Sequence, residues 1–395
     1  GGSGRARQSV LLDAADLREI IYKADSSSIE AATFPKLVAH LTSDKAVPLT
    51  QLRSFMLTFR AFGTPEDLLA TLAKRYARLE RNDAKRNPTL HAKLLRLVEL
   101  RIANLVKYWV TNHFGDFAGS EERIASLDSL LDHVLGNQFQ KIAGALKRAA
   151  HAGPASIVMP SLDMPRTCTE QLKDATLVGS EPLLLAQQIA RVNQFLFRCM
   201  VAERMITNEG VNQETLRPAK DRRTTLQKCF KEAWEAEEEL SPADLTRHLA
   251  GTICALFDLR DWFGAAALLQ VLDERADEAA GLEKTLASQL ASIRKTMAET
   301  STPDTVRAHL GSSSAACVAP LDVFEEELAR LGKEPSSVPS GQGDGVELVN
   351  WVKYEKMAAV VQGWRALCQH EWYSFAWEPT LQHLLLYCAC TVPKK

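Results

Sequence analysis

The sequence predicts an all-α protein that consists of two helical modules. Its apolar residues recur at spacings of three and four over long stretches, which is the period of an amphipathic α-helix. The clearest example is the set Leu94, Val98, Ile102, Leu105 and Trp109. Signals for helix starts recur as well: Thr64 supplies a capping hydroxyl and Pro65 suits the first helical position.

The totals of the sequence bound the class of protein. The chain has 395 residues, enough for two domains, and a formal net charge of −2, so we expect no nucleic-acid partner. No apolar run approaches the roughly 20 residues that span a bilayer, and no secretory signal is visible. The eight cysteines stand mostly singly in apolar contexts, which is typical of a reducing compartment. We therefore expect a cytoplasmic protein without a transmembrane segment.

The chain divides at a segment without helical periodicity. Residues 1–15 form a polar lead whose opening Gly-Gly-Ser-Gly is typical of an artificial linker, and residues 16–150 form the first helical module. Residues 151–178 contain three prolines and are the predicted linker. Residues 179–395 form the second domain, whose first helix is expected to begin with a Ser180 cap and Pro182.

The second domain contains a predicted helical hairpin at about residues 322–368. Asp322 suits the first turn of its first helix, and Gly332 and Pro335 end that helix. Residues 336–345, rich in Ser and Gly, are expected to form a flexible tip. The second helix has an apolar face and side chains available to solvent or to a partner. The apolar residues are Val349, Val352, Val360 and Leu367, and the polar ones are Lys353, Glu355 and Lys356.

The first module resembles the Ras exchanger motif that accompanies exchange domains of the Son-of-sevenless type. The family pattern there is close to FL-TYRSF-TP-ELL, followed by R--VLNVLK-WI--HF-DF. The matching residues of the first segment are Phe55, Leu57, Thr58, Arg60, Phe62, Thr64, Pro65, Leu68 and Leu69. Those of the second are Arg101, Asn104, Leu105, Lys107, Trp109, His113, Phe114, Asp116 and Phe117.

The second domain resembles the catalytic domain of Ras-family guanine-nucleotide exchange factors. Its opening matches the family through Pro182, Leu183, Ala186, Gln188, Ile189, Leu196 and Phe197. The return helix of the hairpin matches the ELINFSKRRKVAE segment without a gap. The residues that carry this match are Glu347, Leu348, Val349, Asn350, Trp351, Lys353, Lys356 and Ala358.

The resemblance implies a Ras exchanger motif module packed on a larger helical catalytic domain with a protruding hairpin. It implies a protein that promotes GDP release and GTP loading on a Ras- or Rap-type GTPase, by wedging the switch I segment open with the hairpin. Such a factor binds the nucleotide-free GTPase better than the loaded form and performs no covalent chemistry. No cofactor or metal of its own is expected, since the GTPase carries the guanine nucleotide and Mg.

The resemblance also implies site residues, position by position. Side chains at the end of the first hairpin helix would disturb the magnesium and phosphate sites; these fall on Ala329 or Leu331 and on Lys333 or Glu334. Other residues would bind the GTPase, with Lys356 facing an acidic residue. This set comprises Ile253, Pro320 or Leu321, Leu328 and Lys356.

The chain departs from the family at the hairpin. The usual acidic pair becomes Lys333 and Glu334, and a lysine beside the phosphate site has the wrong sign to eject nucleotide. Arg260, Asp261 and Trp262 stand where two Asn and a Phe are expected. Two functions therefore stay open: an active exchange factor, or a weak or inactive scaffold that binds a GTPase or another signalling protein. A second, regulatory GTPase at the first module and recruitment to the inner face of a membrane are further possibilities.

Overall fold

The structure is a computed structural model that describes residues 19–24, 28–44, 47–81, 88–135, 139–153, 177–275, 277, 281–340, 345–376, 378, 381–382 and 384–385. Backbone proximity divides the chain into two compact units. Unit 1 comprises Gly1–Met159, Ile206–Gly210 and Arg330–Ala359, and unit 2 comprises Pro160–Met205, Val211–Ala329 and Val360–Lys395. Each unit is mainly helical, so the predicted all-α class is confirmed. None of the described helices is both long and apolar enough to cross a membrane.

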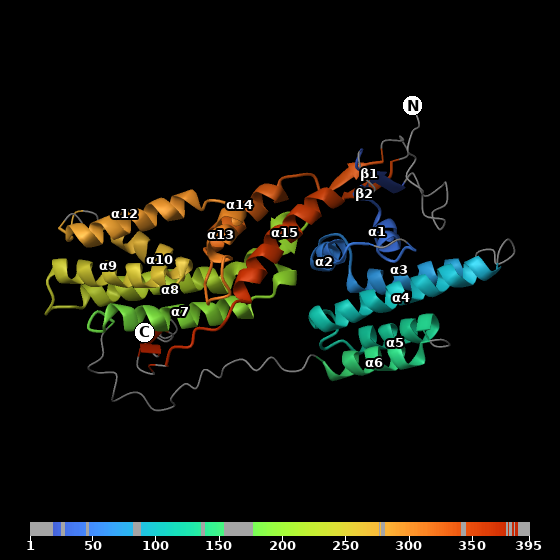
Figure 1. Ribbon diagram of the computed structural model, residues 1–395, viewed down its shortest axis with the longest axis horizontal. Coiled ribbons are helices and arrows are strands. Elements are labelled where there is room, and N and C mark those ends of the chain that lie inside the picture. Colours follow the sequence, from blue (N-terminus) through green and yellow to red (C-terminus); the bar gives the residue numbers. More distant parts are fainter. Residues whose placement is uncertain are drawn as a thin grey trace, which may run out of the picture. The chain divides into compact units, whose positions relative to one another are not determined.

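The first helices of unit 1 lie within residues 34–152 (Figure 1). They are α1 (Phe34–Leu41), α2 (Leu49–Thr58), α3 (Pro65–Arg81), α4 (Pro88–Asn112), α5 (Glu121–Leu135) and α6 (Gln140–Ala152). The long α4 contains the stripe that periodicity predicts, and its members Val98, Ile102 and Trp109 are completely buried. α5 packs against α3 and α6, and α6 also packs against α4. These contacts form a helical layer on each side of one apolar core.

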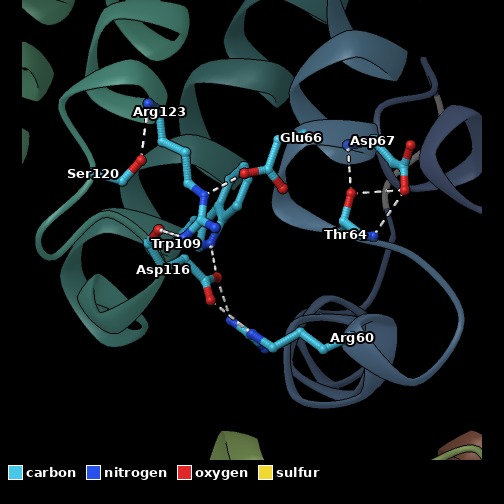
Figure 2. A network of polar contacts seen from close by, with 8 residues as sticks. All are labelled: Arg60, Thr64, Glu66, Asp67, Trp109, Asp116, Ser120 and Arg123. Atoms are coloured by element: carbon cyan, nitrogen blue, oxygen red, sulfur yellow. Dashed lines mark hydrogen bonds and ion pairs between the residues drawn. The ribbon is translucent and has the colours of Figure 1, made fainter.

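A polar network joins the ends of these helices (Figure 2). Arg60 lies in a short 3-10 turn, Phe59–Ala61, directly after α2, and its guanidinium donates to the carboxylate of Asp116. The indole Nε1 of Trp109 donates to the same carboxylate at 2.5 Å. Arg123 of α5 donates to the Asp116 carbonyl at 2.7 Å and forms an ion pair with Glu66 of α3. The network therefore uses polar residues of the exchanger-motif pattern to hold helix ends together.

The predicted start of α3 is confirmed in detail. The Thr64 hydroxyl accepts a hydrogen bond from the Asp67 backbone N–H at 3.1 Å, and the Asp67 carboxylate accepts one from the Thr64 N–H at 3.0 Å. Two backbone donors of the helix end are thus satisfied reciprocally.

A four-stranded antiparallel sheet completes unit 1. Its strands are β1 (Ile20–Tyr22), β2 (Ile29–Ala32), β6 (Glu347–Asn350) and β5 (Ser337–Pro339), in that spatial order. β5 lies in the segment 336–345 that we expected to be a flexible tip, so this expectation is wrong for the described residues of that tip. β5 pairs with β6, and β6 also pairs with β2, which lies more than 300 residues earlier, so local composition could not reveal that second partner.

Unit 2 is a bundle of helices. It contains α7 (Pro182–Cys199), α8 (Gln213–Glu235), α9 (Pro242–Asp258), α10 (Trp262–Asp273), α12 (Lys284–Glu299) and α13 (Pro303–Leu310). α9 packs against α7, α10 and α12, and α10 packs against α8 (Figure 1). The cap of α7 is Glu181 rather than Ser180, because the Glu181 carboxylate accepts from the Leu184 N–H at 2.8 Å.

Two helices contribute residues to both units. α14 (Leu321–Gly332) begins one residue before the predicted Asp322, and α15 (Trp351–Cys368) begins after strand β6 rather than before Val349. The last turn of α14 and the first half of α15 belong to unit 1, and the remainder of each belongs to unit 2. The hairpin tip therefore groups with the N-terminal helices, not with the second domain of the chain.

Candidate functional site

The candidate site is the turn that follows α14, residues 332–336, together with the first half of α15. Gly332 lies against the backbone of the short connection between β3 (Ile206–Thr207) and β4 (Gly210–Val211). A Cβ at position 332 would lie 2.6 Å from the Gly210 Cα and 2.7 Å from the Glu209 carbonyl oxygen. Only glycine permits this close approach of two backbones.

Lys353 of α15 lies beneath this turn and is completely buried. Its ammonium donates to the carbonyl oxygens of Glu334 at 2.7 Å, Gly332 at 3.0 Å and Asn208 at 3.1 Å, and to the Ser336 hydroxyl at 3.0 Å. Burial lowers the pKa of Lys353, and the charge of Glu334 opposes that effect. The ammonium therefore bridges the turn and residues 206–210. Sequence analysis placed Lys353 at the surface, and this was wrong.

A signal for that burial was present in the sequence. Lys353 stands four residues after Val349 and seven before Val360, which is the spacing of the apolar face of the helix. A lysine on an apolar face is buried only where other groups can accept its hydrogen bonds, and here carbonyls of a turn about 20 residues earlier do so.

Asn350 and Ser336 add further bonds to the turn. The Asn350 side-chain amide donates to the Pro335 carbonyl at 2.9 Å, and its backbone N–H donates to the Ser336 carbonyl at 3.0 Å. The Ser336 hydroxyl donates to the Asn208 carbonyl at 2.7 Å. Four of the five residues of the turn, all but Lys333, are thus hydrogen-bonded to α15, to β6 or to residues 206–210. Gly332 has the close backbone contact in addition.

Charged side chains cover the solvent side of the turn. Lys356 is exposed, and its ammonium lies 3.0 Å from Glu334 Oε1 and 3.2 Å from Oε2. Lys333 is exposed beside them. The structure thus brings together three of the predicted residues, Lys333, Glu334 and Lys356. It gives Lys356 an acidic partner within its own chain, where the sequence analysis placed one on the GTPase.

The return helix rests on aromatic residues of α2 and the turn that follows it. Trp351 and Phe55 have ring centroids 6.3 Å apart, and Tyr354 and Phe62 have centroids 4.8 Å apart. Lys23, directly after β1, pairs with Glu355 at 3.5 Å. Together with the β2–β6 pairing, these contacts fix the hairpin tip to the N-terminal helices within unit 1.

The remaining predicted residues differ in accessibility. Leu331 in unit 1 is completely buried, as are three residues of unit 2: Ile253, Leu321 and Leu328. Pro320 is half-buried, whereas Ala329 on the last turn of α14 is exposed. Ala329 and Leu331 were the two apolar candidates for disturbing the magnesium site, and of these only Ala329 has its side chain on the surface.

The three residues that depart from the family in unit 2 have structural contacts. Arg260 adopts a left-handed backbone conformation with φ 65, which an asparagine tolerates more readily, and its guanidinium donates to the Ser313 hydroxyl at 2.7 Å. Asp261 caps α10 by accepting from the Gly264 N–H at 2.8 Å. Trp262 stacks on Phe257 with centroids 5.2 Å apart. The altered segment thus retains a role in packing.

Asp261 also belongs to a fully buried charged cluster. Asn193 donates to its carboxylate at 2.8 Å and accepts from Arg222 Nε at 3.0 Å. Burial raises the pKa of Asp261 to about 6, against the opposing hydrogen bonds and the charge of Arg222. Burial likewise lowers the pKa of Arg222 to about 10. Neither group reaches the surface, so the cluster concerns the stability of unit 2.

The N-terminal part of the chain is similar to one protein family. Residues 28–133 match the family model described as the RasGEF N-terminal motif. These residues comprise β2, α1 to α4 and nearly all of α5, together with the network of Figure 2.

Several proteins similar to this chain are named Ras guanine nucleotide exchange factors. Factor A of Dictyostelium discoideum is 32% identical over 111 residues, which are 28% of this chain and 16% of that protein. Factor J of the same organism is 25% identical over 240 residues, 55% of this chain and 28% of that protein. The protein Son of sevenless of Drosophila melanogaster is 26% identical over 142 residues, 29% of this chain and 9% of that protein. The predicted resemblance is confirmed, and the matches span less than a third of each of these relatives.

Proposed function

We propose that this chain promotes GDP release and GTP loading on a Ras-type small GTPase. One observation carries the proposal: the turn that bears Lys333 and Glu334 is fixed by buried hydrogen bonds, strand pairing and aromatic packing, yet its charged side chains face solvent. A segment that displaces part of a partner protein must itself resist displacement, since its own deformation would consume the binding free energy.

The proposed mechanism combines that stiffness with what the resemblance implies. The tip enters beside the bound nucleotide and displaces the switch I segment, and Glu334 then repels the phosphate groups. Lys356 binds an acidic residue of the GTPase in exchange for Glu334. Ala329 and Pro320 of unit 2 contact the GTPase directly. Ile253, Leu321 and Leu328 support the surface of unit 2 from within, and Leu331 supports that of unit 1. The chain supplies no cofactor, because the GTPase brings its own nucleotide and magnesium.

The test is release of a fluorescent guanine nucleotide from purified Ras-, Rap- and Ral-type GTPases, with this protein at substoichiometric concentration. We expect faster release from at least one GTPase, and a loss of about tenfold or more for Glu334→Gln or Lys356→Met. Lys147→Met is the matched control, because Lys147 also pairs with a carboxylate on the surface of unit 1, Asp132, at 2.6 Å. Unchanged release from every GTPase would contradict the proposal.

A second candidate function is a scaffold that binds a GTPase without exchange. Two observations favour it: the exposed candidate for the apolar position, Ala329, offers only a methyl group, and Glu334 is already neutralised by Lys356. Binding of the nucleotide-free GTPase without acceleration of release would support the scaffold. The proposal has three finer parts: a Rap-type partner, a second GTPase on the N-terminal helices, and recruitment to the inner face of a membrane. The same GTPase panel tests whether a Rap-type GTPase is a partner.

A further inference from the structure

Lys353 is a buried charged group of unit 1 that the mechanism above does not use. An ammonium has three N–H donors, and this one lies within hydrogen-bond distance of four acceptors. Removing it would leave the carbonyls of Gly332 and Glu334 buried without this donor. A buried acceptor that loses its partner is costly, so the turn would open toward water instead.

Glu334 is held at two points by lysines one helical turn apart. Lys353 binds its backbone carbonyl at 2.7 Å, and Lys356 binds its carboxylate at 3.0 Å. The two lysines are spaced i, i+3 on α15 and so lie on adjoining parts of its surface. Of the two lysines, only Lys353 is shielded from solvent. Its bond to the Glu334 carbonyl therefore does not depend on whether a partner protein attracts Lys356.

We propose that Lys353 is a positioning residue, which fixes residues 332–336 and thereby sets where the Glu334 carboxylate lies during nucleotide release. This inference rests on the proposed exchange function. Lys353 does not touch the GTPase. It acts through Glu334, and the loss caused by its removal depends on whether that carboxylate is present.

A double-mutant cycle tests this dependence. The kcat and KM of nucleotide release are measured for the wild type, Lys353→Met, Glu334→Gln and the double variant. We expect Lys353→Met to lower kcat about tenfold with KM within about twofold, and to lower it less than about twofold in the Glu334→Gln background. A merely structural role would produce the same loss in both backgrounds, and that result would overturn the proposal.

The matched control is Lys36→Met. Lys36 is the other buried lysine in the described part of unit 1, and it pairs with Glu19 at 3.2 Å. We expect it to affect thermal stability but not to couple to Glu334. If Lys353→Met fails to fold, Ser336→Ala replaces it in the cycle, because it removes one acceptor of Lys353 and the bond to Asn208. Additive losses for that variant would likewise count against the proposal.

Amide hydrogen exchange separates failure of this inference from failure of the exchange function. In the free protein, we expect the amides of residues 333, 334, 336 and 337 to exchange at least about tenfold faster in Lys353→Met, with those of residues 360–367 unchanged. A wild type that is inactive on every GTPase would refute the exchange function by itself. Unchanged amide exchange in the turn would refute the positioning role whether or not the wild type is active.

Discussion

Ala32 of β2 and Val349 of β6 lie opposite each other in an antiparallel pair, although they come from opposite ends of the chain. The pair joins the N-terminal segment to the hairpin tip by backbone hydrogen bonds, which any side chain permits. The candidate site is therefore supported by backbone pairing between β2 and β6 as well as by the side-chain contacts of α15.

The aromatic contact beneath α15 should contribute strongly to the stability of unit 1. Phe55→Ala removes a completely buried ring that faces Trp351, and we expect the free energy of unfolding to fall by about 3–5 kcal/mol. Urea unfolding checks the value. Leu49→Ala on the same helix is the control, because Leu49 is 52% exposed and its truncation should cost well under 1 kcal/mol. Equal losses for the two variants would contradict the contact.

The close approach at Gly332 predicts a steric effect. Gly332→Ala places a Cβ within 2.7 Å of the Glu209 carbonyl oxygen, so the turn must shift. We expect a loss of stability of about 1–3 kcal/mol and slower nucleotide release. Gly144→Ala in α6 is the control, since its Cβ would meet only the Arg148 side chain at 3.4 Å, and alanine favours the helix. Thermal unfolding and the release assay measure both variants.

The network of Figure 2 predicts a cost for neutralising Asp116. Asp116→Asn replaces one accepting oxygen by a donor that faces Arg60 or Trp109, and we expect a loss of about 1–3 kcal/mol by chemical denaturation. Asp132→Asn is the control: its pair with Lys147 lies at the surface, so the change should stay within about 1 kcal/mol. A negligible effect of Asp116→Asn would show that the network does not hold the helix ends.

Asp261 predicts a pH dependence of stability. Its pKa is about 6 in the folded protein against an ordinary value of 3.8, so the folded state binds the proton more tightly than the unfolded state. The corresponding stabilisation is present below about pH 4 and is lost as the pH rises through 6. Asp261→Asn mimics the protonated form.

Relative to wild type, that variant should gain about 1–1.5 kcal/mol between pH 5 and pH 7.5, measured by urea unfolding at each pH. The control is Asp258→Asn, at an exposed position three residues earlier. A difference between Asp261→Asn and wild type that does not vary with pH would contradict the raised pKa.

The helices were predictable because their signals are local. The apolar stripe of α4 and the Thr64 cap of α3 each lie within a few turns of sequence, and both are confirmed. The sheet was not predictable as a whole, because β6 pairs not only with the nearby β5 but also with β2, which is distant in sequence. The burial of Lys353 was not predicted for a related reason. Its hydrogen-bond acceptors belong to another segment, so the helical pattern placed a lysine on the apolar face without showing which groups accept its hydrogen bonds.

The candidate site was predictable only in part. The positions of Lys333, Glu334 and Lys356 follow from the alignment with the exchange-factor pattern, and the structure places them together. The rotation of α14 about its own axis decides whether Ala329 or Leu331 reaches the surface. In the structure Leu331 is buried and Ala329 is exposed.

The discontinuous composition of unit 1 has a consequence for synthesis of the protein. Chains leave the ribosome from the N-terminus, and domains often fold as they emerge. Unit 1 includes residues 330–359, so Phe55 and Phe62 meet Trp351 and Tyr354 only after the ribosome has translated residues 351–354. Until then these two rings lack their native partners, and we expect the nascent chain to expose apolar surface of the kind that chaperones bind.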